Sequence, residues 1–187
     1  AKWIEADPTF VFHYMNSYEE NGSIICDCME FGLPPLFPYA DGTMPKQSEA
    51  EAKHVRWEID LKNSKLIKTS LDNITGEFPR FDERFALRKY SQGYYAGSIG
   101  HHPKGMSLNS IIHYDYNTGE RKSYTTSEGG AVGEPVFAPK SKDSKDGEGW
   151  LIATEYNAAE NRSNLIFLNA QHVDDGPVAT AQLPHRV

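Results

Sequence analysis

Short turn sequences divide this chain into a succession of β-prone runs, and this pattern limits the fold more than any other feature. Residues 10–15 and 23–29 are such runs, and the segment 19–22 between them ends in Asn-Gly, a strong hairpin signal. Residues 117–120 and 157–161 separate later runs in the same way. Strands joined by such short turns pair antiparallel, so the sequence predicts an all-β fold built as an antiparallel meander.

The pattern predicts about eleven strands and almost no helix. After the first two, the expected strands are 55–61, 66–71, 90–99, 109–116, 121–126, 135–138, 150–156, 165–169 and 178–183. Residues 72–86 are expected to be irregular. Such a meander is typical of a sandwich, a barrel or a propeller. At about 40–45 residues per propeller blade, the length fits roughly three blades, which is too few to close a ring.

One long segment interrupts the strands. Residues 30–52 contain four prolines and several turn formers, and they predict a loop with a helical turn from Lys46 to Ala52. A loop of this length inside a compact domain is usually functional or mobile.

Bulk properties narrow the class of protein. The 187 residues suffice for one domain with a real core, so 1–187 is expected to be a single domain. The net charge is −7 and the basic residues are scattered, which argues against nucleic-acid binding. No apolar run is long enough to span a bilayer, and the first residues lack the apolar core of a signal peptide.

The only cysteines are Cys26 and Cys28. Residues two apart point to the same face of a strand, which is a poor geometry for a disulfide. Two reduced thiols in a cytoplasmic protein are therefore expected, and a zinc site is disfavoured because zinc usually takes four ligands.

His13 interrupts an aromatic run and is the first candidate for chemistry. In a regular strand it would share a face with Val11 and Met15 and would be buried. A buried neutral imidazole needs partners for both ring nitrogens. It could be a hydrogen-bonded core histidine or a metal ligand.

Two glutamates stand beside proline in apolar company, and both are expected to be buried. They are Glu77, in Glu-Phe-Pro-Arg, and Glu134, in Gly-Glu-Pro-Val-Phe. A buried carboxylate is costly unless it is paired. Each could meet an arginine such as Arg80 or Arg84, or each could accept a hydrogen bond from a metal-bound imidazole and fix its tautomer.

The remaining histidines are weaker candidates for a functional site. His54, His113 and His172 stand beside charged or loop residues and are expected at the surface. His101 and His102 lie in a turn-like context between glycine and proline and are expected in an exposed loop.

Six segments, taken in order over nearly the whole chain, resemble the carotenoid cleavage oxygenase family, which includes the lignostilbene dioxygenases. The segments are FHYMNSYE at 12–19, EFPRFDER at 77–84, GEPVF at 133–137, DGEGWL at 146–151, LIFLNA at 165–170 and LPHRV at 183–187. The resemblance implies a seven-bladed β-propeller with Fe(II) on its axis, held by four histidines. It also implies that His13 is one of these catalytic ligands and that Glu77 and Glu134 lie behind other metal-bound histidines, including ones outside this chain.

The resemblance also implies what this sequence lacks. The family's other ligands lie upstream of the FH motif and downstream of the last segment, and His185 is not a ligand. The chain is therefore expected to be a C-terminal portion of such an oxygenase, covering roughly three of the seven blades. With one ligand, the isolated residues are expected to bind no iron and to cleave nothing.

The activity implied for the full-length protein is dioxygenase cleavage of an alkene C=C bond with O2, giving two carbonyl products. The substrate would be a carotenoid, an apocarotenoid or a stilbene, and peripheral membrane contact is a further expectation. Candidates for the lining of an apolar substrate tunnel are Phe31, Leu33, Leu36 and Phe37. The alternative is a non-enzymatic β-propeller or β-sandwich binding module, in which His13, Glu77 and Glu134 are structural.

Overall fold

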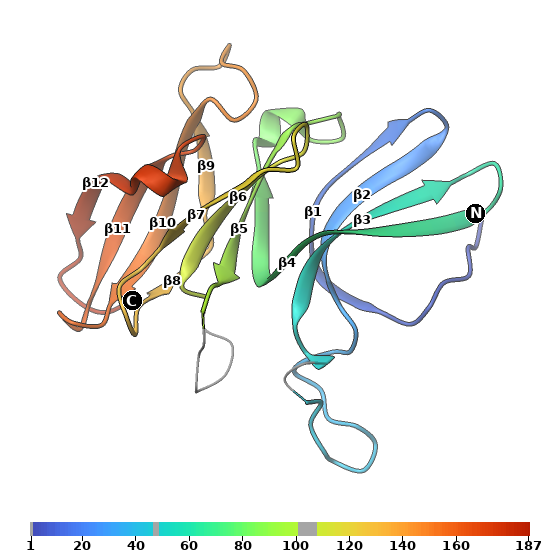
Figure 1. Ribbon diagram of the computed structural model, residues 1–187, viewed down its shortest axis with the longest axis horizontal. Helices are drawn as coiled ribbons and strands as arrows, with labels where there is room; N and C mark the ends of the chain where they lie inside the picture. Colours follow the sequence, from blue (N-terminus) through green and yellow to red (C-terminus); the bar gives the residue numbers. More distant parts are fainter. Residues whose placement is uncertain (1, 47–48, 101–107) are drawn as a thin grey trace.

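The fold is a run of antiparallel hairpins arranged as two sheets (Figure 1). This computed structural model describes residues 2–46, 49–100 and 108–187. The first sheet follows the chain order β1 (Phe10–Glu20), β2 (Ser23–Phe31), β3 (Ala52–Asp60), β4 (Lys65–Phe81), β5 (Gln92–Ser98), β6 (Ser110–Asp115) and β7 (Arg121–Thr125). The second sheet contains β8 (Ala131–Val132), β9 (Val136–Pro139), β10 (Gly149–Asn157), β11 (Arg162–Asn169) and β12 (Pro177–Gln182). The predicted antiparallel meander is confirmed.

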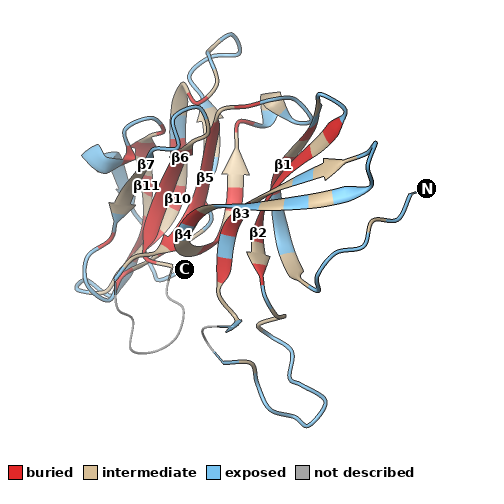
Figure 2. Cartoon of the chain, turned by 45° about the vertical axis from the view of Figure 1, so that its right-hand side comes forward, coloured by how far each residue is buried: buried red, intermediate tan, exposed pale blue. Residues whose placement is uncertain are grey.

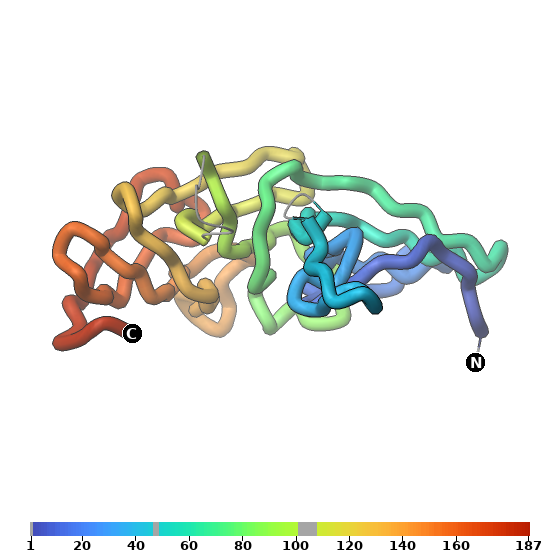
Figure 3. The backbone as a smooth tube through the Cα atoms, turned by 90° about the horizontal axis from the view of Figure 1, so that it is seen from below, coloured from blue at the N-terminus to red at the C-terminus, as the bar shows by residue number. Residues whose placement is uncertain are grey.

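The long strand β4 joins two groups of strands within the first sheet. Residues 65–70 pair with β3, and after a register shift residues 75–81 pair with β5. The chain therefore runs through three successive groups, β1–β4, β4–β7 and β8–β12, which follow one another from the N-terminal to the C-terminal side (Figures 1 and 3). This is the arrangement expected for roughly three blades.

The first hairpin shows why the turn residues predicted the topology. Asn21 and Gly22 have φ angles of 51° and 81°, so both adopt the left-handed conformation that a two-residue hairpin turn requires. Their strands pair from Glu20 opposite Ser23 to Phe10 opposite Phe31.

The core lies on both faces of the middle group. Tyr94 and Ile111 belong to an apolar cluster with Leu151 of β10, whereas their neighbours Tyr95 and Ile112 belong to a second cluster shared with β1 and β2. Successive strand residues point to opposite faces, so β5 and β6 are covered on both sides. Figure 2 shows the buried positions concentrated along these strands.

Some details differ from the sequence-based prediction. Residues 72–86 are not irregular, because β4 continues to Phe81 and the 3-10 helix η2 (Glu83–Phe85) follows. The short strand β8 was not predicted. The expected helical turn is present in part: the N–H groups of Glu49 and Ala50 donate to the carbonyl of Lys46, while 47–48 lie outside the described residues.

The two cysteines are free and buried, as expected for reduced thiols. Burial raises the pKa of Cys26 to about 11 and that of Cys28 further, so neither is a reactive thiolate at neutral pH. The cytoplasmic location inferred from them stays a prediction. Among the described residues, no helix is long and apolar enough to cross a membrane.

Candidate functional site

His13 lies on an irregular stretch of β1. The register moves from Val11 opposite Glu30 to Tyr14 opposite Cys28, so β1 carries an extra residue at this point. A bulge of this kind interrupts the alternation of faces. His13 is therefore not buried with Met15, as a regular strand predicted: its side chain is 51% exposed, whereas Met15 is buried.

The imidazole of His13 is held by a buried carboxylate. Nδ1 of His13 lies 2.6 Å from Oε2 of Glu77, whose side chain is 7% exposed. The same oxygen accepts the backbone N–H of Phe78 at 2.6 Å. An ionised carboxylate only accepts hydrogen bonds, so in the neutral imidazole Nδ1 carries the proton and Nε2 carries the lone pair. Sequence reasoning placed Glu77 behind other imidazoles, but it contacts His13 itself.

Burial and hydrogen bonding act on Glu77 in opposite directions. The pKa of Glu77 is raised above its usual value, because burial raises it more than the N–H of Phe78 and the imidazole of His13 lower it, and the negative charge of Glu134 raises it further. The second oxygen, Oε1, is buried without a hydrogen-bond partner in the described part of the chain. Glu77 therefore depends on His13 and Phe78 to remain charged.

A bulge in β4 aims the Glu77 side chain. Glu77 pairs with Ala96 and Arg80 pairs with Tyr94, so β4 has one residue more than β5 here. Phe78 lies in this bulge with a φ of 58°, an uncommon left-handed conformation for an aromatic residue. Strained backbone of this kind clusters at functional sites.

The second glutamate is placed differently. Glu134 lies in the loop between β8 and β9 and its side chain is 46% exposed, so the expectation that it is buried is wrong. Its Oε1 accepts a hydrogen bond from Nη1 of Arg80 at 3.2 Å. The predicted arginine partner is thus present for Glu134. Arg84 instead pairs with Asp82 of its own turn.

A group of aromatic rings begins next to the imidazole on β1. Phe12 lies 6.3 Å from the His13 ring, 4.7 Å from Phe10 and 5.5 Å from Phe31, measured between ring centroids. Phe37, from the long loop, lies 6.4 Å from Phe10. These four phenylalanines form a continuous apolar cluster beside His13.

The four predicted tunnel residues are not equivalent. Phe31 is 1% exposed and belongs to the core, and Leu33 is half-buried. Leu36 and Phe37 are 71% and 57% exposed on the loop between β2 and β3. Only the last two present large apolar surface to solvent, and the assignment of all four to a tunnel stays a prediction.

The other histidines correct the sequence-based prediction. His54 and His113 are buried rather than at the surface. Burial lowers the pKa of each to about 4. His172 is exposed as predicted, and His101 and His102 lie outside the described residues.

A single imidazole is a partial metal site. Within the described ranges, no group of three or more His, Cys, Asp or Glu side chains is arranged to hold a metal ion. His13 nevertheless has the features of a ligand: one ring nitrogen is bonded to a carboxylate, the other has no hydrogen-bond partner among the described residues, and the side chain is half-exposed. The residues present therefore fit one corner of a metal centre.

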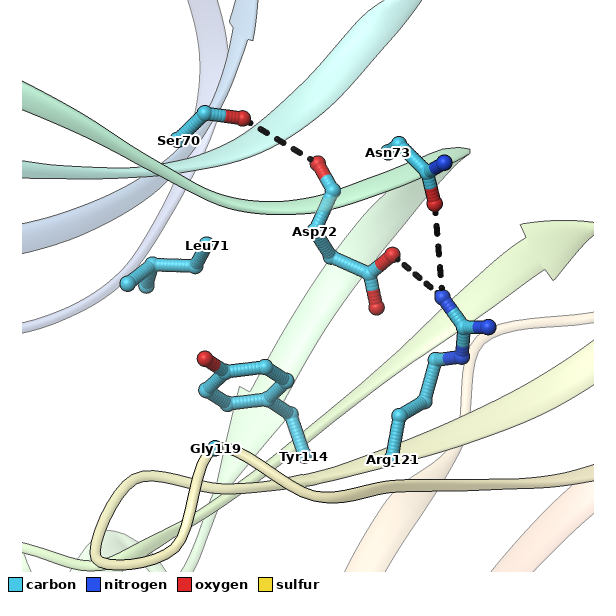
Figure 4. Close-up of a pocket in the computed structure, with 7 residues that line it drawn as sticks. All are labelled: Ser70, Leu71, Asp72, Asn73, Tyr114, Gly119 and Arg121. Atoms are coloured by element: carbon cyan, nitrogen blue, oxygen red, sulfur yellow. Dashed lines mark hydrogen bonds and ion pairs between the residues drawn. The ribbon is translucent and has the colours of Figure 1, made fainter.

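A polar cleft of about 540 Å³ lies elsewhere on the first sheet (Figure 4). It is lined by Ser70, Leu71, Asp72, Asn73, Tyr114, Gly119 and Arg121. Nη1 of Arg121 lies 2.7 Å from Oδ1 of Asp72, and the hydroxyl of Tyr95 donates to Oδ2 at 3.0 Å. These groups are hydrogen-bonded to one another. None of His13, Glu77 and Glu134 lines the cleft.

Comparisons with known proteins identify the family of the chain. The family model described as retinal pigment epithelial membrane protein matches residues 1–187. The isoeugenol monooxygenase of Pseudomonas putida is 33% identical, and the lignostilbene-α,β-dioxygenase isozyme III of Sphingomonas paucimobilis is 30% identical. Both alignments cover 100% of this chain and 41% of the relative, so the chain spans less than half the length of these relatives.

Solved structures give the same result. The cobalt-substituted apocarotenoid oxygenase of Synechocystis superposes with a TM-score of 0.87 at 29% identity, covering 100% of this chain and 39% of that chain. The lignostilbene dioxygenase of Pseudomonas brassicacearum gives a TM-score of 0.88 at 28% identity, covering 96% and 40%. These likenesses confirm the prediction of an all-β fold that forms part of a propeller of the oxygenase type.

Proposed function

The chain belongs to the retinal pigment epithelial membrane protein family, the family of the carotenoid-cleaving and lignostilbene-cleaving oxygenases, and we propose that it forms part of a non-haem Fe(II) dioxygenase. The reaction would cleave an alkene C=C bond with O2 and give two carbonyl products. The hydrogen bond of 2.6 Å between His13 and Glu77 carries this proposal, because it leaves Nε2 of the imidazole available to a metal ion.

In this proposal the described residues hold one metal ligand, His13, in a fixed orientation. Glu77 fixes the tautomer of His13, and the bulge at Phe78 fixes the direction of the Glu77 carboxylate. An Fe(II) ion bound there would supply the capacity to bind and activate O2. The remaining ligands would come from the part of the full-length protein that its relatives have and this chain does not span.

The aromatic cluster supports an apolar substrate. Phe12 is 38% exposed and lies between His13 and the buried Phe31, while Phe37 extends the cluster toward the loop. Edge-to-face contacts between rings are favourable, so a flat conjugated molecule such as a stilbene or an apocarotenoid suits this surface. The cluster does not discriminate between these substrates.

Metal content tests the proposal. In the full-length protein, His13→Ala is expected to abolish stoichiometric iron loading, because the loss of one neutral ligand removes a corner of the site. His172→Ala, at an exposed histidine outside the site, is the matched control and is expected to load normally. Iron measured by mass spectrometry at an unchanged level in the His13 variant would refute the ligand assignment.

A non-enzymatic binding module is the alternative. In that case the bond between His13 and Glu77 would be purely structural, and the full-length wild-type protein would load no iron. The same measurement on the wild-type protein therefore separates the two functions.

We also propose peripheral membrane contact through the loop between β2 and β3. Four large apolar side chains are exposed on it: Leu36, Phe37, Tyr39 and Met44. Figures 1 and 2 show this loop extending from the sheet, with exposed positions along most of its length. Exposed apolar groups on a projecting segment favour insertion at the interface of a bilayer.

Vesicle flotation tests this contact. The full-length protein is expected to float with neutral phospholipid vesicles, and Phe37→Ser is expected to reduce the bound fraction severalfold by removing apolar area. Val178→Ser, at an exposed apolar residue of β12, is the control and should leave flotation unchanged. Equal flotation of the Phe37 variant and the wild-type protein would contradict the proposal.

A further inference from the structure

Arg80 bridges two carboxylates beside the candidate site. It follows the Glu77 bulge on β4, and its side chain is 31% exposed. Nη1 donates to Oε1 of Glu134 at 3.2 Å, and Nη2 donates to Oε1 of Glu83 at 2.9 Å. The planar guanidinium therefore fixes two acceptors at once, which the single ammonium of a lysine does less well.

The backbone of Glu134 is anchored independently of this contact. The N–H of Gly133 donates to the carbonyl of Thr154 on β10 at 2.9 Å. A Cβ at Gly133 would lie 2.4 Å from the Thr154 hydroxyl, so any larger residue would require the Thr154 side chain to move. Pro135 restricts the chain on the other side. The loop is thus held on β10, while the carboxylate of Glu134 is bonded to β4.

The carboxylate of Glu134 is only partly satisfied. Oε1 is bonded to Arg80, and no described residue donates a hydrogen bond to Oε2. With its side chain 46% exposed, Glu134 presents this second oxygen to a group outside the described contacts. Glu77 shows that a carboxylate oxygen at this site can accept from an imidazole, because its Oε2 is bonded to His13.

We propose that Arg80 is a positioning residue for the metal centre: by holding Oε1 of Glu134 it directs Oε2 toward the ring N–H of a metal-binding histidine elsewhere in the full-length protein. This inference rests on the proposed function. It assigns to Arg80 the role that the bulge at Phe78 has for Glu77. The backbone N–H of Phe78 orients the carboxylate of Glu77, and the side chain of Arg80 orients the carboxylate of Glu134.

The test is metal affinity measured without turnover. Metal-free full-length protein is titrated with Co²⁺ and followed by visible absorption. Arg80→Met is expected to weaken Co²⁺ binding about tenfold, the lower end of the range for residues that orient ligands. Glu134→Gln should cost a similar factor, and the double variant should be no weaker than the weaker single variant, because both changes remove one interaction.

Two further variants isolate the role of Arg80. Arg80→Lys keeps the positive charge but lacks the planar guanidinium that bonds two acceptors at once, and it is expected to lose part of the Co²⁺ affinity. Glu83→Gln removes the partner that faces away from Glu134 and is expected to keep Co²⁺ affinity within about twofold. Midpoints of thermal unfolding are recorded for all variants, and Arg80→Gln replaces Arg80→Met if the latter does not fold.

The outcomes separate this inference from the proposed function. Wild-type Co²⁺ affinity in the neutral Arg80 variant, or losses that add in the double variant, would overturn the role of Arg80. If His13→Ala also keeps wild-type Co²⁺ affinity, the proposed function itself fails. If His13→Ala abolishes binding while the neutral Arg80 variant binds normally, only the role of Arg80 fails.

Discussion

The half-exposed histidine on β1 and the two buried histidines on β3 and β6 are held in opposite ways. His13 is half-exposed, and its Nδ1 donates to the buried carboxylate of Glu77, which leaves Nε2 free. His113 is buried on β6, and its Nε2 donates to the amide oxygen of Gln92 at 2.5 Å. The first arrangement leaves a nitrogen lone pair available to a metal ion. The second buries Nδ1 of His113, which has no hydrogen-bond partner among the described residues.

His54 on β3 repeats the buried arrangement. Its Nε2 lies 2.7 Å from the hydroxyl of Tyr116, and that hydroxyl donates to the sulfur of Met15, so the imidazole is the donor. Nδ1 of His54 is buried with no partner in the described part of the chain. Burial and a neutral partner thus make a structural histidine, whereas exposure and a charged partner make a candidate ligand.

The free energy of unfolding is expected to distinguish the buried structural histidines from the candidate ligand His13 most strongly. His54→Ala should lower the free energy of unfolding by about 4 kcal/mol, because it leaves a cavity and a buried hydroxyl without its donor. His13→Ala should cost about 2 kcal/mol, because the half-exposed side chain leaves no closed cavity but the buried carboxylate of Glu77 loses one of its two hydrogen bonds. Urea unfolding of the two variants measures both values, and a larger loss for His13→Ala would invert the comparison.

The dependence of stability on pH gives a smaller effect. His54 and His113 have pKa values lowered from 6.5 to about 4 by burial, so the unfolded chain binds more protons between these values. The free energy of unfolding should therefore fall as the pH decreases, by about 1.6 kcal/mol per histidine between about pH 6.5 and 5. A double variant with phenylalanine at both positions should show a weaker fall. If the free energy of unfolding of the wild-type protein stays constant between pH 6.5 and 5, the lowered pKa values of His54 and His113 are contradicted.

The regular parts of the fold could be predicted because they depend on local signals. The Asn21-Gly22 turn requires two left-handed residues, and the sequence supplies the residue types that tolerate them. The bulge near His13 leaves no such signal, because one extra residue in a strand does not change its composition. The bulge at Phe78 had a signal in the following Pro79, which cannot donate to a strand ladder.

Burial by distant segments was the second source of error. His54 has charged neighbours in the sequence, yet the rings of Tyr95, Tyr114 and Tyr116 from the next group of strands lie around it. Glu134 has apolar neighbours, yet its side chain points to Arg80 near the surface. The family resemblance gave the identity of the candidate residues, but their hydrogen-bond partners depend on packing between groups of strands.

The tautomer of His13 tests the central claim most directly. ¹⁵N NMR of the imidazoles in the metal-free full-length protein distinguishes a protonated ring nitrogen from one with a lone pair. We expect the neutral imidazole of His13 to be protonated at Nδ1 and unprotonated at Nε2, and Glu77→Leu to shift the ring toward the opposite tautomer. His113 serves as the internal control, with its proton on Nε2. A proton on Nε2 of His13 in the wild-type protein would contradict the account.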